Sequence, residues 1–378
     1  MGRPHDALGL TSAVQPIRFK MDAMRAAVLC MALCAACAGP AQTDGIPDTV
    51  RPAVDHCLRH LRACQLPDGA FAQVSPQGRA SAPVWIVPYF AHIAALALLA
   101  HSETGGAADD RARAGRWLDW CAAHQSTAGY WNDFAGTLSA YRDTGRTDAW
   151  DSSAALFLLV ADRFRQAGGT LAASHLAAAR RALACLASVT DPADGLTWAK
   201  PDYRVKYLMD NIEVRAGQLA AERLFAANGQ KTEAQDARAR AERLGRALAT
   251  FWRPERQRFS YALLSSGSHA EMRGKPYPDG LAQLYGLAFV EPHAACWDAV
   301  CRDFTPETGP TVSFGAEWWL MAGGRMGDEP TRLWRARAKE AAAAFTDRTY
   351  LHRHALSVLA LLQGASWLSP QAIPSDQP

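Results

Sequence analysis

The chain has 378 residues, of which 49% are apolar and 20% are charged, and its 40 Lys and Arg against 37 Asp and Glu leave a formal net charge of +3. These proportions are typical of a soluble globular protein that buries a large core. They exclude a disordered chain, a coiled coil and a protein that binds nucleic acid through bulk charge.

The first 40 residues have the pattern of an export signal. Basic residues, the last of them Arg25, come before the apolar stretch 26–38, which is too short to cross a bilayer. Ala36-Cys37-Ala38 provides the small residues of a cleavage site. We therefore expect a periplasmic or secreted protein, with a lipoprotein anchored at Cys37 as the competing interpretation.

Translation is expected to start at Met21 or Met24, because residues 1–20 resemble neither a signal nor a folded segment. The remaining chain, 41–378, is expected to form one domain. No other apolar run in it reaches ~18 residues, so we expect no integral membrane segment in the mature protein.

Past residue 48 the sequence predicts twelve helices, which fall into six consecutive pairs. Apolar side chains recur at helical intervals, as Leu244, Leu248 and Phe251 do. The predicted ranges are 49–64, 84–101, 108–124, 148–167, 170–188, 209–227, 230–252, 279–290, 292–303, 314–324, 329–345 and 350–363.

A glycine turn follows the first, third and fifth of these helices. Gly69, Gly129 and Gly195 recur at intervals of roughly 60 residues, and a Phe, Tyr or Trp follows each of them closely. A long loop then leads to a much more apolar helix, such as the one that contains Ile93–Leu99. The sequence is therefore a series of similar units, each with one polar and one apolar helix.

This alternation predicts an all-α fold with two rings of helices. A helix that is apolar nearly all round must be buried on both sides, whereas an amphipathic helix faces water. Six pairs that close on themselves make an (α/α)6 toroid, and an open solenoid of helical pairs is the alternative. Since the long loops all connect an outer helix to an inner one, closure would collect them on one rim, where functional loops gather.

Acidic residues stand at the starts of four predicted inner helices. They are Asp148, Asp151, Asp210, Glu213, Asp279 and Glu317. Helix capping also favours such residues, by about 0.5–2 kcal/mol. Asp151 and Glu213 lie three residues further along and are harder to explain as caps. Carboxylates that converge on one cavity repel one another and raise the pKa of some of them, so we expect this set to have a chemical role.

Aromatic residues gather in the same loops. They are Trp85, Tyr130, Trp131, Tyr141, Trp150, Trp198, Tyr203, Tyr207, Tyr277, Trp318, Trp319 and Tyr350. Flat rings beside carboxylates suit carbohydrate, although core packing is the simpler reading of any single ring. The expected substrate contacts are Trp131, Asp148, Trp150, Trp198, Tyr207, Tyr277, Asp279, Glu317 and Trp318.

Over residues 49–365 the chain resembles the six-hairpin glycosidases, which are (α/α)6-toroid carbohydrate enzymes. The resemblance rests on the hairpin count, the loop-then-inner-helix layout and the strings DAWDSSAA at 148–155, DNIE at 210–213 and YPDG at 277–280. It implies an exported glycoside hydrolase that acts on a poly- or oligosaccharide through two carboxylates.

Carried over by position, the resemblance implies that Asp151 is the general acid and that Asp210 or Glu213 is the base or a substrate contact. No cofactor is expected. No metal is expected either, because the cysteines form no paired motif and His352 and His354 have no third ligand nearby in the sequence. The six cysteines past the signal are expected to be mainly small buried hydrophobic residues.

Two other functions remain open at this point. A toroid polysaccharide lyase would use a proton-abstracting set such as Tyr203, Tyr207 and His269. A non-catalytic carbohydrate-binding or scaffold protein of an envelope polysaccharide system is the other alternative. Five basic residues near the loops would bind an anionic sugar or simply be solvated. They are Arg204, Lys206, Arg273, Lys275 and Arg348.

Overall fold

The computed structural model describes residues 46–105, 108–304 and 315–368. All of these residues belong to one compact unit. The predicted export signal at 1–40, the two predicted start sites and Cys37 lie outside the described residues.

Twelve α-helices are present in the described part of the chain, and each coincides with a predicted one. They are α2 (Arg51–Cys64), α3 (Pro88–Glu103), α4 (Ala108–His124), α5 (Asp151–Gln166), α6 (Ala173–Ser188), α7 (Leu208–Ala227), α8 (Lys231–Ala247), α9 (Leu281–Tyr285), α10 (Ala294–Phe304), α11 (Ala316–Met326), α12 (Asp328–Ala343) and α13 (Leu351–Gln363). Short π-helical turns, Pro276–Gly280 and Gly286–Val290, extend α9 at both ends.

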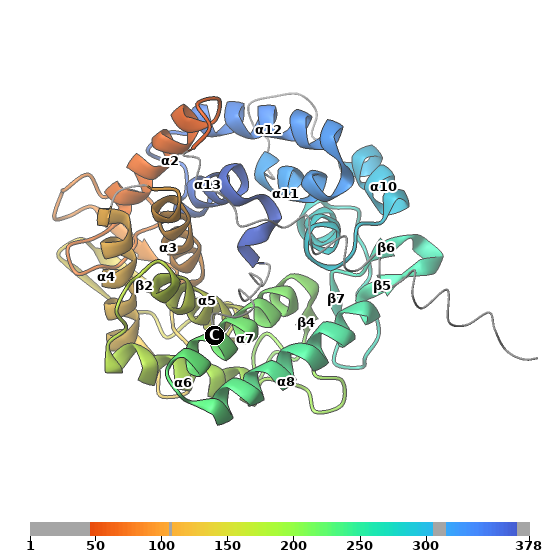
Figure 1. Ribbon diagram of the computed structural model, residues 1–378, viewed down its shortest axis with the longest axis horizontal. Helices are drawn as coiled ribbons and strands as arrows, with labels where there is room; N and C mark the ends of the chain where they lie inside the picture. The colour runs from red at the N-terminus through yellow and green to blue at the C-terminus, as the bar shows by residue number, and fades with distance from the viewer. Residues whose placement is uncertain (1–45, 106–107, 305–314, 369–378) are drawn as a thin grey trace, which may run out of the picture. The chain divides into compact units, whose positions relative to one another are not determined.

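These helices form two concentric rings (Figure 1). The even-numbered helices make the outer ring and the odd-numbered helices make the inner one. The last inner helix, α13, packs against α3 and α2 of the first pair, and α12 also packs against α2. The array is therefore closed, and the predicted (α/α)6 toroid is confirmed while the open solenoid is wrong.

Burial explains why the two kinds of helix alternate. The outer helix α8 buries only Ala234, Ala237, Ala241 and Leu244, which lie on one stripe. The inner helix α5 buries every side chain from Asp151 to Phe164, because it packs against other helices on all sides. Outer helices are therefore apolar on one face only, because only that face is covered, whereas inner helices are apolar nearly all round because both of their faces are covered.

The repeated glycine turn has the same geometry in successive units. Gly69, Gly129 and Gly195 all have a positive φ, at 98°, 92° and 89°, which glycine adopts without steric cost. The side chain of Gln65 donates to the carbonyl of Gly69 at 3.1 Å, and that of Gln125 donates to Gly129 in the same way at 2.9 Å. Equivalent glutamines therefore fasten equivalent turns.

Short antiparallel strands build the loops that lead to the inner helices. β1 (Pro83–Ile86), β2 (Phe134–Thr137) and β3 (Ala140–Asp143) form one sheet in the order β1-β2-β3. β4 (Lys206–Tyr207) pairs with β7 (Ala262–Leu263), and β5 (Trp252–Arg253) pairs with β6 (Arg258–Phe259). The sequence analysis predicted no strands here. Because each strand has only two to four residues, it carries almost no periodic signal.

Two further expectations concern the described residues. Cys57, Cys64, Cys121, Cys185 and Cys296 are buried with free thiols, as small hydrophobic residues would be. Within ranges 46–105, 108–304 and 315–368, no helix has both the length and the apolar character of a membrane span.

Candidate active site

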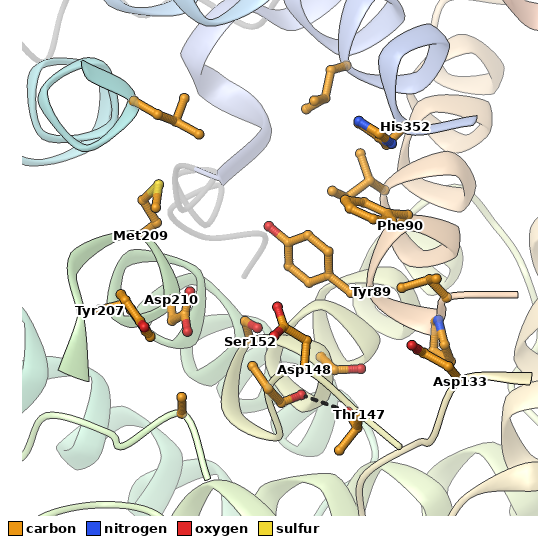
Figure 2. A pocket seen from close by; sticks show the side chains of 18 of the residues that line it. Tyr89, Phe90, Asp133, Thr147, Asp148, Ser152, Tyr207, Met209, Asp210 and His352 are labelled. Carbon is orange, nitrogen blue, oxygen red and sulfur yellow. Dashed lines mark hydrogen bonds between the residues drawn. The ribbon is translucent and has the colours of Figure 1, made fainter. Parts of the chain in front are cut away.

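A cavity of about 770 Å³ opens at one rim of the toroid. Every inner helix contributes to its wall, either through its first turns or through the loop that precedes it. Figure 2 shows side chains of α3, α5, α7 and α13 that border it. The size lies within the range of roughly 300–1,000 Å³ that is usual for small-molecule sites. The predicted gathering of the long loops on one rim is confirmed.

Asp210 lies in the first turn of α7 and borders the cavity (Figure 2). Burial raises the pKa of Asp210 well above its ordinary value, and the nearby charges of Asp151, Glu213 and Asp148 raise it further. The raised pKa favours the protonated form of the Asp210 carboxyl, which lies beside open space.

Two more carboxylates border the same cavity. Asp148 precedes α5 and is exposed there, and Asp133 comes from the loop before β2. In Figure 2 the Asp148 side chain lies between those of Asp210 and Asp133. Burial, together with the charge of Asp148, raises the pKa of Asp133 to about 6. The cavity thus brings together three aspartates, of which Asp210 and Asp133 have raised pKa values.

Asp151 lies beneath the cavity instead of lining it. It is fully buried, and one carboxylate oxygen accepts from the hydroxyl of Thr197 at 2.7 Å while the other accepts from the backbone N–H of Ser152 at 2.8 Å. Asn211 in turn accepts from the backbone N–H of Thr197 at 2.7 Å. The network connects the start of α5 with the start of α7. Burial raises the pKa of Asp151 as well.

Glu213 is also fully buried and does not line the cavity. Its Oε1 accepts hydrogen bonds from the hydroxyls of Tyr89, at 2.8 Å, and Tyr285, at 2.9 Å. Both of those rings do border the cavity. Burial raises the pKa of Glu213 to about 8. Glu213 therefore holds two wall residues in place while it is itself shielded from a ligand.

The other expected substrate contacts fall into two groups. Trp131, Tyr207, Tyr277, Glu317 and Trp318 line the cavity together with Asp148. Asp279, Trp150 and Trp198 do not line it.

Each member of the second group has a structural partner. Asp279 accepts from the backbone N–H groups of Arg273 and Lys275, at 2.7 and 3.0 Å, and so fixes its own loop. The Trp150 ring stacks on Tyr130, and the Trp198 ring lies under the Arg204 guanidinium. Helix-start position alone did not distinguish these residues from those that face the cavity.

Several residues that border the cavity were not predicted from the sequence. They are Tyr89, Phe90, Asp133, Lys200 and Arg353. Asp133 is the one with a signal in the sequence, because it follows the aromatic pair Tyr130-Trp131 of a repeated turn. The others stand in loops or first turns with no motif to mark them.

The residues proposed for a lyase are only partly together. Tyr203 and Tyr207 line the cavity and their hydroxyls are 3.0 Å apart, but His269 does not line it. None of the five basic residues considered for an anionic sugar borders the cavity. Lys206, for example, is engaged by the carboxylates of Asp191 and Asp194, each at 2.6 Å. Among described residues, no group of His, Cys, Asp and Glu has the arrangement of a metal site.

The toroid resembles solved carbohydrate enzymes at low sequence identity. A glycoside hydrolase family 63 mannosylglycerate hydrolase from Thermus thermophilus, in complex with glucose, is 12% identical at a TM-score of 0.55, over 83% of this chain and 99% of that one. A family 76 α-1,6-mannanase from Salegentibacter sp., an inactive variant with bound α-1,6-mannotriose, is 10% identical at a TM-score of 0.53, over 84% and 99%.

An α-amylase from Clostridium perfringens is 7% identical at a TM-score of 0.53, over 84% of this chain and 98% of that one. No protein-family model and no curated protein matches the sequence. At such identities the likeness shows the fold. The resemblance to the six-hairpin glycosidases is confirmed at that level.

Proposed function

We propose that the chain is a glycoside hydrolase that cleaves a poly- or oligosaccharide in the rim cavity. The observation that carries the proposal is the pairing of Asp210, whose pKa burial raises well above its ordinary value, with Asp148 in the same cavity. Glycoside hydrolysis requires one carboxyl that donates a proton and another that activates water or attacks as a nucleophile. The fold supports the proposal because solved toroids of this kind include enzymes named as glycosidases.

In the proposed reaction Asp210 gives its proton to the glycosidic oxygen as the bond from that oxygen to the anomeric carbon breaks. Asp148 accepts a proton from the water that adds to the anomeric carbon, so one water is consumed and two hydroxyl groups result. Asp148 is assigned this role because it is exposed in the cavity and its charge reaches Asp210. Asp133 lies on the far side of Asp148 in Figure 2 and is the third aspartate of the wall.

Asp151 and Glu213 are positioning residues in this proposal. Neither borders the cavity, and their hydrogen bonds fix Thr197, Tyr89 and Tyr285. Their charges also raise the pKa of Asp210, although burial is the larger cause. The proposal therefore transfers the role of general acid from Asp151 to Asp210.

Aromatic rings at the mouth of the cavity suit a substrate longer than one sugar. Trp85, Tyr203 and Tyr277 border the cavity, yet they are 51%, 47% and 55% exposed. An exposed large ring is unusual unless it serves a contact surface, and the apolar faces of sugars stack on such rings. An exported protein would meet extracellular or periplasmic glycans, so the proposal includes export through segment 1–40.

The test is a cleavage screen of the purified chain against glucans, mannans and other neutral and acidic glycans, followed by kinetics of Asp210→Asn. We expect the native protein to release reducing ends from at least one glycan and Asp210→Asn to lose about 10²–10⁴-fold in kcat. Asp236→Asn, the same change on outer helix α8, is the control and should match the native protein.

Two results would contradict the proposal. Full activity in a folded Asp210→Asn protein would remove Asp210 as the acid. Tight binding of a glycan with no product from the native protein would instead support the non-catalytic carbohydrate-binding alternative.

A further inference from the structure

An ion pair between a half-buried arginine and a buried glutamate stands in the cavity wall away from the three aspartates. Glu317 lies in the first turn of α11 and Arg353 in the first turn of α13, and both border the cavity. The Arg353 Nε donates to the Glu317 Oε1 at 2.9 Å. Helices α11 and α13 face α5 and α7 across the inner ring (Figure 1). The pair therefore lies on the wall opposite the proposed catalytic carboxylates.

One oxygen of this pair is unsatisfied. Glu317 is only 1% exposed, and its Oε2 has no hydrogen-bond partner among the described residues. A buried carboxylate oxygen without a donor costs folding free energy. The Oε2 atom is itself covered, but the Glu317 side chain borders the cavity, so a small shift of that side chain would bring Oε2 within reach of a hydroxyl group on a bound molecule.

The Glu317 carboxylate lies directly against the backbone of Gly315. A Cβ on Gly315 would come within 1.7 Å of the Glu317 Cδ, so any larger residue at 315 would force the Glu317 carboxylate out of its present position. Arg353 uses its Nε toward Glu317, and a guanidinium has further N–H donors for an acceptor. The cavity wall therefore has a hydrogen-bond donor, the Arg353 guanidinium, next to an acceptor, the Glu317 Oε2.

We propose that Glu317 and Arg353 recognise two neighbouring hydroxyl groups of an uncharged sugar. One hydroxyl donates to the Glu317 Oε2, and its neighbour accepts from the Arg353 guanidinium. The inference deepens the proposed function by naming the substrate class, and it rests on carbohydrate occupying the cavity.

The same pair disfavours a uronic acid. The positive charge of Arg353 is already balanced by Glu317, so a sugar carboxylate at this place would meet a buried negative charge. His352 also borders the cavity, but burial, aided by the Arg353 charge, lowers its pKa to about 4, and it adds no positive charge at neutral pH. Lys200 is the remaining cation among the described cavity residues, and its Nζ donates to the carbonyl of Thr147.

The test measures binding apart from cleavage. Asp210→Asn protein is titrated with neutral oligosaccharides, either gluco- or manno-oligosaccharides, and with oligoglucuronate, by calorimetry and by saturation-transfer NMR. Glu317→Gln and Arg353→Gln are then added to this background. Glu340→Gln, on outer helix α12, is the matched control because Glu340 is exposed.

We expect Glu317→Gln to weaken binding of the neutral sugar by about tenfold or more, because a charged acceptor is replaced by a neutral amide. The same variant should bind oligoglucuronate more tightly than its parent does, since the Arg353 charge is then uncompensated. Arg353→Gln should lose the neutral sugar without gaining the uronate. If Glu317→Gln does not fold, Arg353→Gln still tests the proposal, because it should lose affinity for the neutral sugar and gain no affinity for oligoglucuronate.

The inference is overturned if the parent prefers the uronate, if neutral-sugar affinity survives both changes, or if both variants weaken every sugar equally. Each of these results leaves the proposed function standing whenever the native protein cleaves a glycan. Conversely, neutral-sugar binding that depends on Glu317, with no cleavage by the native protein, would overturn the hydrolase proposal and leave this one intact.

Discussion

Replacement of Glu213 by Gln is the sharpest test of the buried acid network. The carboxyl is fully buried and its pKa is raised to about 8 because burial disfavours its charged form. Gln has nearly the same shape and keeps an oxygen that accepts from Tyr89 and Tyr285, but it cannot ionise. The substitution therefore removes the titration and preserves the hydrogen bonds.

The magnitude follows from linkage between protonation and folding. The pKa of Glu213 rises from 4.5 when unfolded to about 8 when folded, so the folded state binds the proton more tightly. Its stabilising effect is fully present below the unfolded pKa and is lost as the pH rises toward the folded pKa. At roughly 1.4 kcal/mol per pKa unit, the native protein should lose about 3 kcal/mol of stability between about pH 5 and pH 8 from this group alone.

The assay is urea denaturation followed by circular dichroism at several pH values. Glu213→Gln should match the native protein near pH 5 and exceed it increasingly toward pH 8, because the other titrating groups are common to both proteins. Glu340→Gln, at an exposed site, should follow the native curve throughout. Parallel curves for the native protein and Glu213→Gln would refute the reasoning, since they would mean that Glu213 ionises as easily in the folded state as in the unfolded one.

Two further predictions concern the site and the repeated turn. Asp151→Asn should keep kcat within about tenfold of the native value. The alkaline limb of its pH–rate profile should move to lower pH, because the Asp151 charge helps to raise the pKa of Asp210. A loss of kcat as large as that in Asp210→Asn would make Asp151 the general acid instead. Gly129→Ala should lower the unfolding free energy by about 3 kcal/mol in urea titrations, since its Cβ would lie 2.1 Å from the Arg181 carbonyl oxygen in addition to the positive φ. Gly229→Ala is the control, because Gly229 also has a positive φ but a Cβ there would meet nothing within 4 Å, so it should lower the unfolding free energy by only about 1 kcal/mol. An equally large loss of stability in both variants would contradict the predicted clash with the Arg181 carbonyl.

The sequence by itself determined the helices and their pairing. Helix formation depends on local periodicity, and the alternation of one-sided and all-round apolar helices follows from how many faces each must cover. The positions of the glycine turns could also be predicted from the sequence. A positive φ restricts the residue type wherever it occurs, so Gly69, Gly129 and Gly195 mark their turns without reference to the rest of the fold.

Only the tertiary structure decided which carboxylates face the cavity. Asp148 and Asp151 lie three residues apart at the start of one helix, and Asp210 and Glu213 lie three residues apart near the start of another. One member of each pair nevertheless borders the cavity, whereas the other is buried and does not line it. Successive residues of a helix point in directions about 100° apart, and the sequence does not contain the rotation of each helix about its axis. That rotation is set by packing between the rings. Asp133, on the loop before β2, borders the same cavity as the Glu317–Arg353 pair only because the toroid closes through the packing of α13 against α2 and α3.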